Sequence, residues 1–128
     1  MSVNNASELI GVITGYLLPR CVHVAAELGI DDLLDDTPQS AETLAQATHV
    51  QVDSLNRVLR LLASHGIFEE VSGGYGHTDL SQLLRTEHPQ SLRPYARMVG
   101  SQLFWQCFGE LQHAVATNEP AMNKLDYR

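Results

Sequence analysis

The fold is decided by residues 40–78, which read SAETLAQATHVQVDSLNRVLRLLASHGIFEEVSGGYGHT. Ser40 is a good N-cap because its hydroxyl can accept a bond from a free backbone N–H of the first turn, and Glu42 complements the helix dipole there. The apolar side of this first helix consists of Leu44, Ala45 and Ala47. Because a turn over 48–51 follows, the sequence predicts one short helix at the start of the stretch.

A second helix is predicted over 52–65, and a hairpin follows it. The apolar residues of this helix recur at helical spacing, at Leu55, Val58, Leu59 and Leu62. Gly66 stands where a left-handed C-terminal cap is favoured. Residues 67–71 and 75–78 then have the composition of two strands with a tight turn, 72–74, between them. Helix, turn, helix and hairpin in this order predict a winged helix-turn-helix with a short β-hairpin wing.

A helical segment precedes this stretch, at about residues 7–28. Its apolar stripe consists of Ile10, Ile13, Leu17, Cys21, Val24 and Leu28. Other apolar residues widen the stripe beyond the single face that packing on one core requires. Pro19 is expected to kink or split the segment near its middle, and a short helix over 31–34 is expected after Gly29.

The width of this stripe bears on quaternary structure. Left exposed, it would be a larger apolar patch than a monomer in water usually carries, whereas the two-fold interface of a homodimer would cover it. The six stripe residues are therefore the candidate dimer interface. The alternative is that the same side chains fill the core of their own chain.

Helices are also predicted after the wing. Thr78 is expected to cap a short helix that bears Leu80, Leu83 and Leu84, and Ser91 to cap a longer helical stretch over 92–117 that bends near Gly100. The chain is thus expected to be one mainly α domain, 1–128. Its expected parts are dimerisation helices at about 1–35, the winged helix-turn-helix at 40–78 and C-terminal helices at 79–117. Residues 118–128 show no strong periodicity.

An aromatic band on the C-terminal helices suits a small-molecule pocket. Flat apolar side chains with a few polar tips can bind an aromatic metabolite. The candidate pocket residues are Tyr16, Met98, Phe104, Trp105, Phe108 and His113. The alternative is that a band at helical spacing is core. His113 could act as a base near neutral pH, with a hydrogen-bonded structural role as the alternative, and no catalytic residue is predicted.

The charge balance argues against nucleic-acid binding. The chain has 8 basic and 15 acidic side chains, a formal net charge of -7. The outward basic groups of the second helix are Arg57 and Arg60, and Asp53 lies at the helix end that normally enters the major groove. The wing has no Lys or Arg. A winged-helix transcription regulator is therefore kept only as the alternative from another functional class.

Metal sites, disulfides and membrane insertion are not predicted either. No two histidines are spaced at i, i+3 or i, i+4, and Cys21 and Cys107 are expected to be free, buried thiols. The acidic run Asp31, Asp32, Asp35 and Asp36 is expected to be a solvated helix end and loop. The longest uncharged apolar stretch, 9–19, is too short to span a bilayer, and no signal sequence is evident, so a cytoplasmic location is expected.

Several short motifs, taken in order, are similar to those of a known family. They are VAAELGIDDLL at 24–34, SAETLA at 40–45, LRLLASHGIF at 59–68, TDLSQLLR at 78–85 and WQCFGEL at 105–111. The ordered set resembles the amino-terminal dimerisation domain of S-adenosylmethionine-dependent O-methyltransferases of bacterial and plant type, which act on phenolic, polyketide or phenazine-like metabolites. The resemblance covers about residues 8–122, and it depends on the order and spacing of the motifs rather than on any one of them.

This resemblance implies a homodimer of intertwined chains that also forms a lid over the substrate pocket of a following domain. That domain would hold S-adenosylmethionine and the catalytic base, and neither site is predicted in this chain, because the glycines at 73, 74 and 76 are explained by the wing turn. By itself the chain is not expected to transfer a methyl group, whereas the parent protein is. A stand-alone small-molecule-binding dimer derived from such a domain is the alternative.

Overall fold

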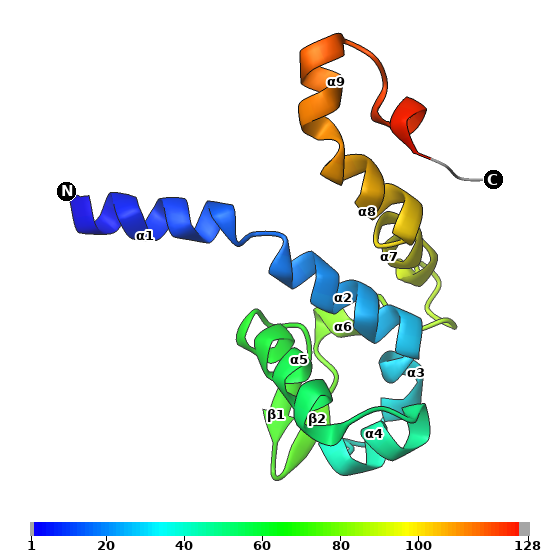
Figure 1. The fold of residues 1–128 in the computed structure, drawn as a ribbon. Helices are drawn as coiled ribbons and strands as arrows, with labels where there is room; N and C mark the ends of the chain where they lie inside the picture. Colours follow the sequence, from blue (N-terminus) through cyan, green and yellow to red (C-terminus); the bar gives the residue numbers. More distant parts are fainter. Residues whose placement is uncertain (1, 126–128) are drawn as a thin grey trace.

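The computed structural model describes residues 2–125 and consists mainly of helices, with one small hairpin. Figure 1 shows a compact body formed by α2 to α6 and the hairpin, from which α1 extends on one side and α8 and α9 on another. The first extension precedes α2 in the chain, and the second follows α7, which packs beside α2. The molecule is therefore a winged-helix body with two projecting helical arms.

The helix-turn-helix of the body has the predicted bounds and caps. In α4, Ala41–Thr48, the Ser40 hydroxyl accepts the backbone N–H of Thr43 at 3.1 Å. After α5, Val52–Ser64, Gly66 has a left-handed φ of 78°, and the Ile67 N–H bonds back to the Leu62 carbonyl at 2.9 Å. This is the Schellman arrangement that a glycine cap allows, and it confirms the predicted end of the second helix.

The wing is a hairpin of two short antiparallel strands, β1 (Glu69–Val71) and β2 (Gly74–Gly76). Both strands are shorter than predicted. The first begins late because Phe68 has a left-handed φ of 73° and turns its ring into the core, which interrupts an extended backbone. Tyr75 fastens the wing to the body, since its hydroxyl donates to Asn56 Oδ1 at 2.6 Å and its backbone pairs with Gln39.

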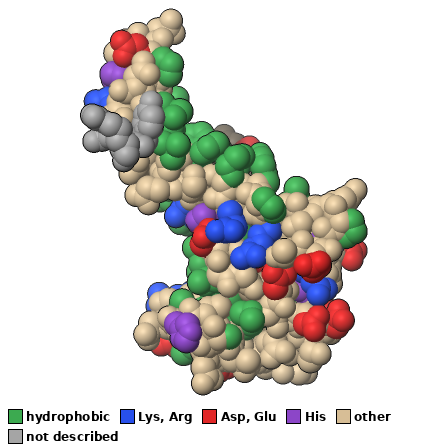
Figure 2. Space-filling model, turned by 90° about the vertical axis from the view of Figure 1, so that its right-hand side faces the viewer, with side chains coloured by type: hydrophobic (Ala, Val, Ile, Leu, Met, Phe, Trp, Pro, Cys, Tyr) green, Lys and Arg blue, Asp and Glu red, His purple; other side chains and the backbone are tan. Residues whose placement is uncertain are grey.

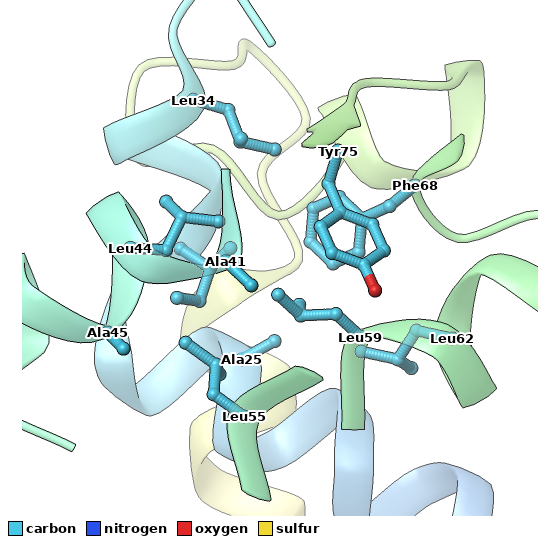
Figure 3. Packing of buried hydrophobic residues seen from close by; sticks show 11 residues of the cluster. Ala25, Leu34, Ala41, Leu44, Ala45, Leu55, Leu59, Leu62, Phe68 and Tyr75 are labelled. Atoms are coloured by element: carbon cyan, nitrogen blue, oxygen red, sulfur yellow. The ribbon is translucent and has the colours of Figure 1, made fainter. Parts of the chain in front are cut away.

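One hydrophobic core holds the body together. Figure 3 shows the side chains of α2, α4, α5 and the wing converging on it, with Phe68 and Tyr75 on the same side as Leu59 and Leu62. Ala25 and Ile30 bring the end of α2 and the start of α3 into the same cluster. Because these residues are almost fully buried, the body completes its own core without a partner.

The N-terminal segment splits at a different place from the one predicted. It forms α1 (Ser2–Ile13), α2 (Leu17–Leu28) and the short α3 (Ile30–Leu34), with the break at residues 14–16. Pro19 lies in the first turn of α2, where a missing N–H costs little. Its ring would crowd the carbonyl four residues earlier, at Gly15, so the break falls one turn before the proline.

The C-terminal stretch forms several short helices instead of one bent helix. After α6 (Asp79–Gln82), which is capped by Thr78, come α7 (Arg93–Val99), α8 (Gln102–Gly109), α9 (Leu111–Thr117) and the 3-10 helix η1 (Ala121–Lys124). The N-cap of α7 is Leu92 rather than Ser91, although the Ser91 hydroxyl still accepts the Arg93 N–H at 3.3 Å. The chain breaks at Gly100, where a bend was predicted, and again at Glu110, where none was predicted.

Packing of α7 against α2 joins the second arm to the body. Arg93 Nε donates to the Ala26 carbonyl at 2.8 Å, and Arg97 pairs with Glu27 at 3.1 Å. At Gly100 a Cβ atom would overlap the ring of His23, so only glycine permits this close approach. Figure 2 shows charged side chains gathered at mid-height on this face and hydrophobic ones along the arm above them.

The acidic run is not a solvated loop throughout. Asp31 is buried, with 1% of its surface exposed, and neither of its carboxylate oxygens has a hydrogen-bond partner. Asp32 accepts the backbone N–H and the hydroxyl of Thr86, while Arg85 pairs with Asp35 at 3.2 Å. The run is amphipathic along α3, because Asp31 turns inward beside Ile30 and Leu34 while Asp32 faces the cations of the following segments.

Candidate functional site

The first feature of functional interest is the apolar surface of α1 and the start of α2. Three of the predicted interface residues, Ile10, Ile13 and Leu17, are 60%, 63% and 47% exposed. Leu9 and Val12 lie among them and are equally exposed. We call these five residues the N-terminal apolar face. A contiguous face of this kind on a helix that leaves the body is typical of a surface that another molecule covers.

The other three predicted interface residues lie closer to the body. Cys21, Val24 and Leu28 are partly buried, and both Cys21 and Leu28 pack against the core of their own chain. The structure thus divides the predicted set, because its first half is available to a partner while its second half is largely used within the chain. Cys21 and Cys107 are free thiols, each partly rather than fully buried.

The N-terminal helices also reach the length of a membrane span. The helical segment 4–28 is long and apolar enough to cross a bilayer, and 11% of its most apolar stretch is buried. The uncharged stretch 9–19 is too short by itself, and the longer segment meets the criteria because it also includes Arg20 and the residues after it. That the chain does not enter a membrane stays a prediction. A helix that packs on a second protein meets the same criteria of length and composition, so the face has two possible environments.

A second feature is an apolar groove of about 770 Å³ between α2 and the helices α7 and α8. Three of the predicted pocket residues, Tyr16, Trp105 and Phe108, line it. Apolar side chains of α2 and of the segment 92–99 complete the walls, notably Leu18, Val22, Leu92, Tyr95 and Val99. A concave apolar site of this size fits a small organic molecule.

The aromatic residues of this groove surround a cation that sequence analysis did not single out. The guanidinium of Arg20 lies 4.7 Å from the centre of the Trp105 ring, and its Nη1 donates to the Gly100 carbonyl at 2.7 Å. The Tyr16 and Trp105 rings are 5.9 Å apart and tilted by 47°. One signal was present in the sequence, since Arg20 is the single charged residue between positions 9 and 26.

The remaining predicted pocket residues do not join the groove. Met98 lines a different hollow, beside His23 and Arg97. Phe104 is 37% exposed and is not among the groove residues. His113 lies on α9, where its Nε2 is 3.8 Å from a Glu119 carboxylate oxygen. The predicted set was therefore half assembled. The breaks at Gly100 and Glu110 separate Met98 and His113 from α8, whereas Phe104 lies on α8 itself but outside the groove.

A third feature is a polar hollow of about 450 Å³ between α5 and the wing, the surface that a winged helix would present to DNA. Glu42, Asp53 and Glu70 lie around it. Its cation, Arg60, has its Nε 3.8 Å from Glu70. The acidic side chains outnumber the basic ones, so this surface lacks the positive potential that attracts a phosphate backbone.

The described residues offer little for catalysis. Within residues 2–125 no group of three His, Cys, Asp or Glu side chains could hold a metal ion. Burial raises the pKa of Asp31 to about 7, but its carboxylate is enclosed in the body and faces no groove. S-Adenosylmethionine does not fit the same part of the chain, because the clustered glycines form an antiparallel hairpin and not a loop between a parallel strand and a helix.

Comparison with known proteins points to one family. A family model described as the O-methyltransferase dimerisation domain matches residues 10–87. The chain is 42% identical over 120 residues to Phenazine O-methyltransferase PhzM from Lysobacter antibioticus, an alignment that covers 93% of this chain and 35% of that protein.

Solved structures show the same likeness. The mitomycin 7-O-methyltransferase MmcR has a TM-score of 0.87 at 30% identity, with 99% of this chain and 39% of that one covered. CalO1, a methyltransferase in calicheamicin biosynthesis solved in an SAH-bound form, has a TM-score of 0.82 at 31% identity, with 94% and 36% covered. The chain spans about a third of the length of the curated relatives it matches.

Proposed function

The chain belongs to the O-methyltransferase dimerisation domain family, and from this premise we propose that it joins two copies of a small-molecule methyltransferase and forms one wall of its substrate pocket. The transfer itself would be carried out elsewhere in the whole protein, where S-adenosylmethionine and a catalytic base would bind. The proposal has two parts, dimerisation and pocket formation, and a different surface supports each.

One observation carries the dimerisation part. The N-terminal apolar face projects from a body whose own core is already complete, so folding of a single chain leaves it in contact with water. A second copy would remove it from water, and burial of apolar area is the main driving force of protein association. In a two-fold interface the same residues, Ile10, Ile13 and Leu17, would lie on both sides.

The groove supports the pocket part. It lies between α2, which continues from the N-terminal apolar face, and α7 and α8, so dimerisation and pocket formation would involve neighbouring surfaces. Its lining is almost wholly apolar, with tyrosine, tryptophan and phenylalanine rings suited to a flat metabolite. The ligand would be an aromatic small molecule, and the rest of the methyltransferase would close the open side.

Light scattering of the purified chain tests dimerisation directly. A mass of twice 14.1 kDa is expected at micromolar concentration. The double variant Ile10→Glu/Ile13→Glu should be monomeric, because four buried carboxylates would face one another across the two-fold axis. Leu80→Glu is the matched control, since Leu80 is 55% exposed on α6, away from the N-terminal apolar face. A monomeric wild-type chain would refute this part.

Vesicle flotation tests the other environment of segment 4–28. The wild-type chain should stay with the protein fraction when mixed with zwitterionic or anionic vesicles, because the partner chain already covers its apolar helix. Flotation of wild type together with loss of flotation in Ile10→Glu/Ile13→Glu would assign the face to a lipid surface and overturn dimerisation as its purpose.

Two alternatives remain under this proposal. A stand-alone dimer that binds small molecules would use both surfaces in the same way but without methyl transfer. A transcription regulator would need the hollow beside the wing, where Arg60 is already paired with Glu70. A gel-shift assay in rising salt separates the two, because tight, salt-sensitive binding to duplex DNA would favour the regulator. A cytoplasmic location is part of the proposal and is consistent with two free cysteines.

A further inference from the structure

We propose that the groove between α2 and α7–α8 binds a planar aromatic carboxylate and that Arg20 recognises its negative charge. This inference rests on the proposed function, because it names the chemical class of ligand for the same pocket wall. It begins from the placement of a single cation in a groove that is otherwise apolar.

Among the arginines of the described chain, Arg20 alone combines partial burial with the lack of a counter-ion. Arg60, Arg85, Arg93 and Arg97 each have a carboxylate oxygen within 4.0 Å. Arg57 lies exposed to water on α5. Arg20 is partly buried, and among residues 2–125 no carboxylate lies within ion-pair distance of it. A partly buried guanidinium without a carboxylate beside it can pair with the negative charge of a ligand.

The guanidinium is also held in place before any ligand arrives. It stacks 4.7 Å from the centre of the Trp105 ring while Nη1 donates to the Gly100 carbonyl at 2.7 Å. That bond uses one of the five N–H donors, and a carbonyl oxygen carries no full negative charge to neutralise the cation. Fixed donors in a groove with apolar walls bind an anion more tightly than flexible ones in water, because less order is lost and screening is weaker.

The rings beside Arg20 select a flat ligand. Tyr16 and Trp105 form a tilted pair with centroids 5.9 Å apart, and Tyr95 and Phe108 line the same groove. Aromatic side chains in such arrangements accept another ring by offset stacking or edge-to-face contact. The carboxylate of an aromatic acid could therefore meet Arg20 while its ring lies among these four side chains.

Titration with matched probes tests the charge preference. The probes are 1-naphthoate and its neutral amide, 1-naphthamide, which differ only in the acid group. Trp105 is the only tryptophan, so its indole N–H resonance in NMR spectra reports binding at the groove. Naphthoate should bind about tenfold to a hundredfold more tightly than naphthamide, as one charge-assisted hydrogen bond or ion pair in a half-buried site provides.

Arg20→Gln should abolish this preference and leave naphthamide binding unchanged, whereas Arg57→Gln should keep the preference. If Arg20→Gln no longer binds naphthamide, its groove is damaged and Arg20→Lys decides instead. That variant keeps the charge without the planar guanidinium. Equal affinities for acid and amide in Arg20→Lys, or a full preference for the acid in an intact Arg20→Gln, would overturn the proposal.

The remaining outcomes separate this inference from its premise. Equal binding of both probes by the wild-type chain would contradict only the role of Arg20, because the groove would still bind an aromatic ring. If a dimeric chain binds neither probe, both the proposed pocket wall and the role of Arg20 are refuted, whereas dimerisation is not. N-Acetylglutamate α-amide, which mimics an acidic side chain of a protein, should not compete with naphthoate. If it competes equally well, the carboxylate belongs to a polypeptide and the aromatic ligand is refuted.

Discussion

The winged-helix body and its two arms both contain large apolar side chains, but the body buries them and the arms expose them. In the body, Leu44, Leu59 and Phe68 are almost completely buried in one core, to which α2, α3, α4, α5 and the wing contribute. In the arms, Ile13 on α1 and Phe108 on α8 remain about two-thirds exposed. The body is thus stabilised by its own core, whereas the arms keep apolar side chains exposed to water. These exposed side chains are the surfaces that we propose for association with other molecules.

Truncation of a core side chain should give the largest contrast between the regions. Leu59→Ala removes a fully buried side chain from α5, and a loss of about 2–5 kcal/mol in the free energy of unfolding is expected. Ile13→Ala should change that free energy by less than about 0.5 kcal/mol at concentrations where the chain is monomeric. Urea unfolding monitored by circular dichroism measures both. Similar losses in the two variants would mean that α1 is part of the folding unit.

Asp31 is the polar exception inside the body, and it should make the stability of the body depend on pH. Removal from water raises its pKa to about 7 from an ordinary value of 3.8. The folded chain therefore holds this proton more tightly than the unfolded chain. The resulting stability is full below about pH 3.8, declines as the pH rises to about 7 and is absent above it, a difference on the order of 4 kcal/mol.

The comparison of wild type with Asp31→Asn isolates this contribution. The variant cannot ionise, so its free energy of unfolding should exceed that of wild type increasingly as the pH is raised from about 4 to about 8. Urea titrations at several pH values within this window measure the difference. Parallel pH profiles for the two proteins would show that the carboxylate finds a partner or water in solution.

A substitution at the junction tests whether the second arm is held rigidly on the body. Gly100→Ala places a methyl group against the His23 ring and should cost about 1–3 kcal/mol by forcing α7 away from α2. It should also shift the Trp105 resonance, because the Gly100 carbonyl binds Arg20, which stacks on that ring.

Gly109→Ala is the matched control for this junction. A Cβ atom at Gly109 meets nothing within 4 Å, so alanine there should be neutral or stabilising by about 0.5–1 kcal/mol through its better helix propensity. Thermal unfolding and the NMR spectrum distinguish the pair. The interpretation of a tight junction fails if both alanines are tolerated alike.

The smallest effect concerns one helix cap from each region. Ser40 caps α4 of the body with a bond of 3.1 Å to Thr43, whereas Ser101 caps α8 of the arm with a longer bond of 3.5 Å to Phe104. Ser40→Ala should cost about 1 kcal/mol, and Ser101→Ala should cost less, because α8 contributes little to the buried core. Thermal denaturation of the two variants ranks them, and the reverse order would show that the arm belongs to the cooperative unit.

Much of the body was predictable because its signals are local. The hydroxyl of Ser40, the φ preference of Gly66 and the tight turn of the hairpin each depend on residues nearby in the sequence. The breaks in the arms were less predictable. Pro19 displaced its break by one turn. A bend near Gly100 was predicted, but the close approach of His23, a residue far away in the sequence, was not.

The sequence by itself determined the winged-helix order, the shortage of basic groups and the excess of apolar surface on the first helices, since each is a property of composition and short-range spacing. Only the tertiary structure decided that Asp31 is buried and that Tyr16, Arg20 and Trp105 meet in one groove. Arg20 and Gly100 are 80 residues apart, and helical periodicity states which face of a helix is apolar but not which distant helix packs on it.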